Sequence, residues 1–127
     1  LFHMEESIPT AAQLDAICDY LLSLRDIGGD NIILQFQDID HEKPSSGLSF
    51  IQACRSDSEE KPFRVEVRMD DKAGYHILAD KETSAEKAMD FIRYACLHRS
   101  LPEAESWEDI SEEALKEYEN MKNSENA

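Results

Sequence analysis

The sequence is poor in basic residues, glycine, proline and cysteine, and it contains no long apolar run. Only 13 Lys and Arg stand against 28 Asp and Glu, and the resulting net charge of −15 repels nucleic-acid phosphates and anionic lipids. Four glycines and four prolines in 127 residues exclude a low-complexity or collagen-like chain. No apolar run reaches the roughly 18 residues of a membrane span. With 41% hydrophobic residues, the chain can instead form one domain around a single core.

The three cysteines are too few and too widely spaced for a disulfide framework or a zinc site. Cys18, Cys54 and Cys96 each lie within an apolar pattern, so we expect reduced thiols in the core and a cytoplasmic protein. The N-terminus lacks the basic and apolar regions of a secretory signal. We expect residues 1–3 to be a cloning remnant outside the fold, and we place a single domain at residues 4–127.

Three segments have the three- and four-residue spacing of helices. In the first, residues 11–25, the apolar stripe is Leu14, Ile17, Cys18, Leu21 and Leu24. Thr10 and Gln13 have the spacing of a capping box before this helix, and Gly28 and Gly29 are typical of a helix end. The second segment ends near Leu97, and its stripe is Ala88, Phe91, Ile92, Ala95 and Cys96.

The ends of the last two helices are also predicted from the residues around them. Thr83 and Glu86 have capping-box spacing before the second helix. The third, residues 111–121, is weakly amphipathic, with the apolar anchors Leu115, Tyr118 and Met121. We expect residues 122–127 to fray.

Four segments show the two-residue alternation of strands: residues 31–37, 48–54, 63–69 and 75–80. Alternation predicts that Leu48, Phe50, Gln52 and Cys54 share one face of the second strand. A turn at residues 70–74 joins the last two strands as a hairpin. The short polar links favour an antiparallel meander, and the helices need a sheet face to cover. The sequence therefore predicts an α+β two-layer sandwich, with a four-stranded antiparallel sheet packed by helices in the order α-β-β-β-β-α-α.

Motifs for catalysis, metals or cofactors are missing. None of the four histidines forms the closely spaced pair of a zinc hydrolase, and no glycine-rich phosphate loop occurs. Asp38, Asp40 and Glu42 alternate as in a calcium loop, but the glycine and glutamate that such a loop needs are missing, which favours a solvated acidic loop. Alternation also places Cys54 and His76 on different faces, which opposes a nucleophile pair. We expect no metal and no cofactor.

Acidic residues are concentrated towards the C-terminus. Residues 100–127 contain nine acids against two lysines, a net charge of −7. Solubility is one explanation, and a basic partner attracted by the negative field is the other. Trp107, beside Glu105, Glu108 and Asp109, is either an interface anchor or, as we favour, an apolar group that holds the last segment to the core.

Four short motifs occur in an order that resembles a known family. They are FIQA at residues 50–53, VEVR at 65–68, TSAE at 83–86 and WEDI at 107–110. In this order, over about residues 31–113, they resemble small acidic bacterial immunity proteins of polymorphic toxin systems. The resemblance implies a protein that binds a cognate toxin and blocks its active site, with no catalytic residue of its own. A longer first helix and a more extended third helix depart from that pattern and leave the toxin open.

The leading hypothesis is a cytoplasmic immunity protein that neutralises a toxin through an acidic surface, without turnover, as a monomer or weak homodimer. Its expected partner is a basic toxin domain, not a nucleic acid or a membrane. The candidate partner-binding residues are Asp38, Asp40, Glu42, Asp70, Asp71, Glu105, Trp107, Glu108 and Asp109. The alternative is an acidic chaperone or adaptor for a secreted effector, although the usual helix of that class has no predicted counterpart between Asn31 and Asp80. A small enzyme would require a pocket with convergent polar groups.

Overall fold

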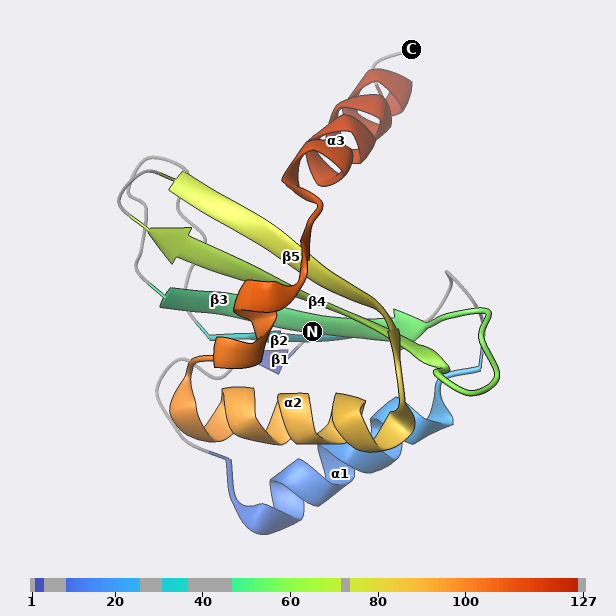
Figure 1. Cartoon of the computed structure of the whole chain (residues 1–127), viewed down its shortest axis with the longest axis vertical. Helices are drawn as coiled ribbons and strands as arrows, with labels where there is room; N and C mark the ends of the chain where they lie inside the picture. The colour runs from blue at the N-terminus through green and yellow to red at the C-terminus, as the bar shows by residue number, and fades with distance from the viewer. Residues whose placement is uncertain (1, 4–8, 26–30, 37–46, 72–73, 126–127) are drawn as a thin grey trace.

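The structure is a computed structural model that describes residues 2–3, 9–25, 31–36, 47–71 and 74–125 (Figure 1). Its elements are β1 (Phe2–His3), α1 (Ala11–Ser23), β2 (Asn31–Gln35), β3 (Gly47–Arg55), β4 (Phe63–Asp71), β5 (Gly74–Thr83), α2 (Ala85–His98), the 3₁₀ helix η1 (Pro102–Ser106), β6 (Glu108–Asp109) and α3 (Ser111–Glu125). No helix within these residues is both long enough and apolar enough to cross a membrane.

The sheet is open and its strands follow chain order. Strands β2 to β6 form an antiparallel meander of five, which confirms the predicted α+β class and antiparallel sheet. The predicted number of four strands was wrong, because β6 pairs with Leu78–Ala79 at one edge. At the other edge β1 pairs in parallel with β2. Phe2–His3 therefore pairs with a sheet edge, although we expected residues 1–3 outside the fold, since the edge of β2 offers backbone partners.

The helices α1 and α2 lie together on one face of the sheet, whereas α3 projects away from the body (Figure 1). The guanidinium Nη2 of Arg93 on α2 lies 3.1 Å from the Asp15 carboxylate on α1, so an ion pair also joins the two helices. The predicted two-layer packing thus involves two of the three helices. The anchors that we expected to bury α3 are exposed, by 48% for Leu115, 63% for Tyr118 and 66% for Met121.

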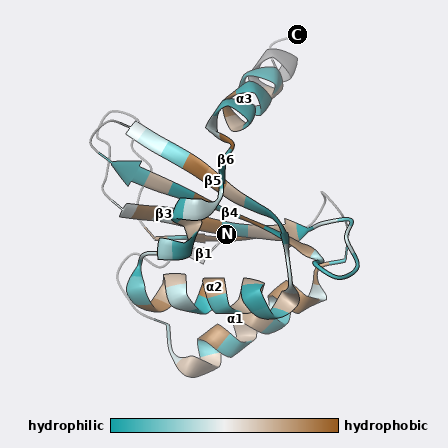
Figure 2. Cartoon of the chain, in the orientation of Figure 1, coloured by the Kyte–Doolittle hydropathy of each residue, from teal (hydrophilic) through white to brown (hydrophobic). Residues whose placement is uncertain are grey.

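The core fills the space between the sheet and α1 and α2. Alternate residues of the central strands face the helices, and Phe63, Val65 and Val67 are each at most 1% exposed. The predicted apolar stripes of α1 and α2 supply the opposite wall of the core. Figure 2 shows hydrophobic and hydrophilic residues alternating along these two helices. A bulge between Leu48 and Phe50 turns Leu48 into this core, so the predicted grouping of Leu48 with Phe50 was wrong.

The first helix begins as the sequence predicts and ends earlier. Thr10 and Gln13 form the capping box, with the Gln13 amide oxygen accepting from the Thr10 backbone at 2.8 Å and the Thr10 hydroxyl accepting from the Gln13 backbone at 3.2 Å. The helix ends at Ser23, with Leu24 as the extended cap residue. The predicted stop at residues 28–29 lies outside the described residues.

The second helix is capped one residue later than predicted. The Ser84 hydroxyl accepts from the Lys87 backbone N–H at 3.2 Å, so Ser84 is the N-cap. Thr83 instead ends β5, where it pairs with Phe63, and its side chain is buried. Its hydroxyl donates to the Asp80 carboxylate at 2.9 Å. A β-branched residue fits the strand ladder well, which explains why Thr83 is not the cap.

Two further boundaries differ from the sequence-based prediction. The hairpin turn is shorter than residues 70–74, because β4 continues through Asp71 and β5 starts at Gly74, whose φ of +143° favours glycine. Helix α3 continues through Glu125, whereas the predicted segment ended at residue 121. Neither glycine nor proline occurs in α3 to end it earlier.

Candidate functional site

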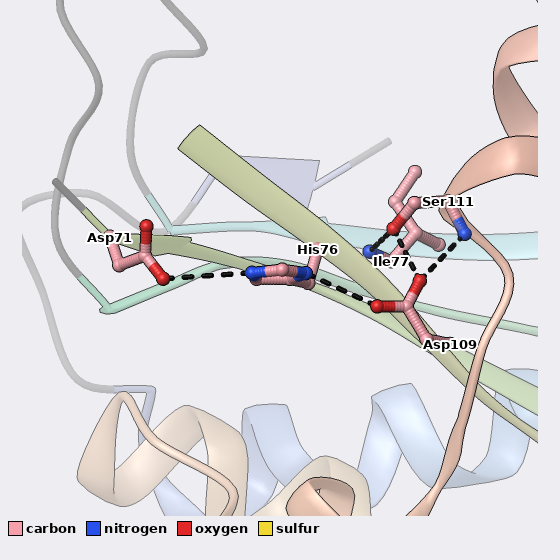
Figure 3. Close-up of polar contacts among 5 residues, drawn as sticks. All are labelled: Asp71, His76, Ile77, Asp109 and Ser111. Atoms are coloured by element: carbon pink, nitrogen blue, oxygen red, sulfur yellow. Dashed lines mark hydrogen bonds and ion pairs between the residues drawn. The ribbon is translucent and has the colours of Figure 1, made fainter. Parts of the chain in front are cut away.

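His76 connects two acidic segments at the edge where β5 meets the start of α3 (Figure 3). Its Nε2 lies 3.6 Å from Asp71 Oδ2 at the end of β4, and its Nδ1 lies 3.2 Å from Asp109 Oδ2 on β6. All three side chains are about half exposed, at 52% for His76, 54% for Asp71 and 50% for Asp109. A protonated imidazole would present one N–H to each carboxylate, so the ring can bridge them.

Ser111 and Asp109 fasten the first residue of α3 to β5. Asp109 Oδ1 accepts from the Ser111 backbone N–H at 2.9 Å and from the Ser111 hydroxyl at 2.6 Å. The same hydroxyl accepts from the Ile77 backbone N–H at 2.9 Å, and the Ile110 N–H donates to the Ile77 carbonyl at 2.8 Å. The donors on Ser111, and then His76, hold the pKa of Asp109 below its usual value. We call Ile77, Asp109 and Ser111 the α3 clamp.

The cluster contains Ser, His and Asp, but it is not arranged as a nucleophile triad. In a triad the histidine ring accepts the serine proton, and the carboxylate orients the ring. Here Ser111 donates its proton to Asp109, and His76 contacts the other oxygen of the same carboxylate. The second role of the Ser111 hydroxyl, as acceptor from Ile77, fixes it within the fold. The arrangement therefore supports a structural connection rather than acyl transfer.

A hollow beside this cluster is rimmed by carboxylates. It has a volume of about 450 Å³ and is lined by Tyr75, His76, Asp109, Ile110, Ser111, Glu112 and Glu113. The two glutamates occupy the first turn of α3, where the helix dipole favours negative charge. Among the described residues, no ion pair involves Glu112 or Glu113. We call this feature the acidic hollow.

A second hollow adjoins the first and has a more apolar lining. It has a volume of about 440 Å³ and lies between the uncovered sheet face and α3, lined by Phe50, Arg68, Tyr75, Ile77, Ala114, Leu115 and Tyr118. Tyr75 lines both hollows, so they adjoin each other at this residue. We call this second feature the apolar groove. Sequence reasoning identified Leu115 and Tyr118 as apolar anchors but missed the groove, because the position of α3 follows from the clamp.

The acidic residues predicted to bind a partner are distributed unevenly. Asp71 and Asp109 come together through His76, which alternation alone did not indicate. Asp70 is only 7% exposed, and its Oδ1 lies 2.9 Å from Nε of Arg68, which is equally buried. It is therefore held inside the fold and is not presented to a partner. Asp38, Asp40 and Glu42 lie outside the described residues.

The remaining predicted residues surround η1 and β6. Trp107 packs edge-on against Phe91, with ring centroids 5.1 Å apart, and is part of the partly buried rim of the core. This packing confirms that it anchors the last segment. Glu108 lies 3.0 Å from Lys81 Nζ, while Glu105 is exposed on η1. The structure thus brings Asp109 and Asp71 into one site and leaves Glu105 apart from it.

The cysteines are thiols rather than disulfides, as the sequence predicts. Cys18 and Cys96 are buried and Cys54 is half-buried. Burial raises the pKa of all three, that of Cys96 to about 11, so the thiol form dominates near neutral pH. Cys54 pairs with Arg64 across the uncovered sheet face, whereas His76 pairs with Met69 on the helix-covered side. The two residues therefore lie on opposite faces.

Neither metal-binding clusters nor similar proteins point to a function for the described part of the chain. Across the described ranges, no group of three or more His, Cys, Asp or Glu has a metal-binding arrangement. Comparisons of the chain with protein-family models, curated proteins and solved structures find no significant match. The resemblance to immunity proteins therefore depends on the four short motifs alone.

Proposed function

We propose that this protein is a cytoplasmic immunity protein that binds a basic toxin domain and blocks it without turnover. The observation that carries the proposal is the acidic hollow beside the apolar groove, which share Tyr75 as a lining residue. Exposed carboxylates with an adjacent apolar surface are what recognition of a cationic protein requires, since charge steers association and a desolvated centre supplies most of the affinity.

The charge distribution supports one binding edge in particular. Asp71, Asp109, Glu112 and Glu113 belong to three separate elements, yet they surround the same histidine and helix start. Such a group can occupy the cationic positions where a toxin would hold an anionic substrate. Blocking by occupancy needs no catalytic group, which agrees with the connecting role of Ser111 and His76.

Growth rescue in bacteria tests the proposal. A toxin domain encoded beside this chain is induced alone and together with the chain. The expected result is growth arrest in the first case and normal growth in the second. Continued arrest in the presence of the folded, abundant chain would contradict the immunity function.

Two double charge-reversal variants, compared with each other, locate the toxin-binding surface. The double variant Glu112→Lys, Glu113→Lys should lose protection and show a weaker dependence of binding on salt. Glu59 and Glu60 are also adjacent and exposed, but they lie between β3 and β4. Glu59→Lys, Glu60→Lys makes the same change in net charge and should protect fully. Equal protection by both double variants would show that the toxin binds elsewhere.

One observation also favours the chaperone or adaptor alternative. Chaperones of secreted effectors present apolar surface to their clients, and the apolar groove is such a surface. They usually act as dimers, so light scattering separates the two classes. We expect a monomer or weak homodimer for the immunity protein, and an obligate dimer would favour the chaperone.

A further inference from the structure

We propose that the apolar groove and the acidic hollow together bind one segment of the partner, an amphipathic cationic helix. Its apolar side chains enter the groove and its Lys or Arg side chains enter the acidic hollow. This inference rests on the proposed function and specifies the part of the partner that is recognised. Figure 1 shows where β5 and α3 lie, and Figure 3 shows Ile77, Asp109 and Ser111 where the two elements meet.

The apolar half is built from two sides. Phe50, Tyr75 and Ile77 contribute from the uncovered face of the sheet, and Leu115 and Tyr118 contribute from α3. Leu115 and Tyr118 are 48% and 63% exposed, which is high for large apolar groups on a helix beside a sheet. An apolar side chain that filled the groove would remove these surfaces from water, which favours binding.

The base of the groove is held in place before any partner arrives. Arg68 is 7% exposed, and its guanidinium carbon lies 4.1 Å from the centre of the Tyr75 ring. Asp70 neutralises Arg68 at 2.9 Å, so this cation does not repel a basic partner. A fixed ring and guanidinium lose little conformational freedom on binding, which favours affinity.

The negative charge of the acidic hollow favours a partner segment that carries Lys or Arg. The acidic hollow shares Tyr75 with the groove and adds Asp109, Glu112 and Glu113 at its rim. An apolar residue seated in the groove therefore places a neighbouring Lys or Arg of the same segment near these carboxylates. A helix presents apolar and basic side chains on adjacent stripes, as helix-in-groove recognition requires.

The same charges argue against a second copy of this chain as the occupant. Each copy has a net charge of −15, and pairing the groove with itself would bring two acidic hollows together. A nucleic acid meets the same repulsion from its phosphates.

The first experiment measures binding of a defined probe to the full chain. The probe is a fluorescein-labelled helical peptide of about 12 residues with a Leu stripe beside a Lys stripe. We expect a Kd of about 10 μM by anisotropy at low salt, weakened by added NaCl. Peptides with Ser in place of Leu, or Glu in place of Lys, should bind at least about tenfold more weakly. No binding of the probe at millimolar concentration would overturn the inference.

Matched variants test the groove itself. Leu115→Ser should weaken probe binding at least about tenfold. Leu97 on α2 is 44% exposed, close to the 48% of Leu115, so Leu97→Ser is the control and should leave binding unchanged. Both variants should retain the unfolding temperature of the wild-type chain. Equal effects of the two substitutions would overturn the proposed site.

Amide chemical shifts locate the probe independently. We expect changes at Tyr75, Ile77 and Leu115 in ¹H–¹⁵N spectra. Changes centred on Phe91 and Leu101 would instead indicate the separate hollow of about 310 Å³ between α2 and η1, and would overturn the inference. A dimer that is lost in Leu115→Ser would assign the groove to a second copy, which also overturns it.

Failure of this inference can be distinguished from failure of the immunity function. If the chain rescues growth and Leu115→Ser rescues equally well, the groove is not the contact but the function stands. If the probe binds as expected and no rescue occurs, the groove is a binding site and the immunity function is wrong.

Discussion

Replacing Asp70 tests the contribution of its buried ion pair with Arg68 to stability. Its side chain and that of Arg68 are 3% and 9% exposed, so Asp70→Ala leaves a buried guanidinium without its counter-ion. Breaking a buried pair in this way costs about 3–5 kcal/mol. Because Arg68 still stacks on Tyr75, which is 38% exposed, we expect the lower end, about 3 kcal/mol. The unfolding temperature should fall by roughly 10 °C.

The neighbouring acid provides the control for this experiment. Asp71 undergoes the same substitution, but its side chain is 54% exposed, so Asp71→Ala should change stability by less than about 0.5 kcal/mol. Urea unfolding can be followed by the fluorescence of Trp107, the single tryptophan, which packs on Phe91. A loss below about 1 kcal/mol for Asp70→Ala, or equal losses for both variants, would refute the buried-pair reasoning.

The remaining predictions concern the clamp and the cysteines. Ser111→Ala removes the acceptor of the Ile77 N–H, so hydrogen exchange at that amide should accelerate and stability should fall by about 1–2 kcal/mol. Because the folded pKa of Asp109 lies below its ordinary value of 3.8, its contribution to stability is complete above pH 3.8 and is lost as pH falls through the folded pKa. Asp109→Ala should therefore flatten acid-unfolding curves below that pH. With its pKa raised to about 11 by burial, Cys96 should react with a thiol reagent at pH 8 more slowly than half-buried Cys54.

The elements with strict periodicity could be predicted from sequence. Phe63, Val65 and Val67 alternate with charged residues, and the structure buries them as alternation requires. The stripes of α1 and α2 were predicted for the same reason. In each case local spacing alone determines which side of the element faces the core.

The features that sequence reasoning missed depend on contacts between distant segments. The two residues of β6 are too few to show a period, and they form a strand because β5 offers its edge. Asp70 and Asp71 are adjacent residues of the same type, so the sequence does not tell them apart. The pleat of β4 points their side chains to opposite faces, and that of Asp70 faces buried Arg68. The site at His76 joins residues from β4, β5 and β6, and no local motif specifies that meeting.

The attachment of α3 at its first residue makes the helix a lever arm. Its 15 residues give a rod of about 22 Å, and the described hydrogen bonds to the sheet lie at the Ser111 end. A rotation of about 10° around that pivot moves the far end by roughly 4 Å. Because Leu115 lies close to Ser111, the same rotation displaces its side chain by far less than that of Met121. The hydrogen bonds of Ser111 thereby influence the angle between α3 and the sheet, and with it the width of the apolar groove.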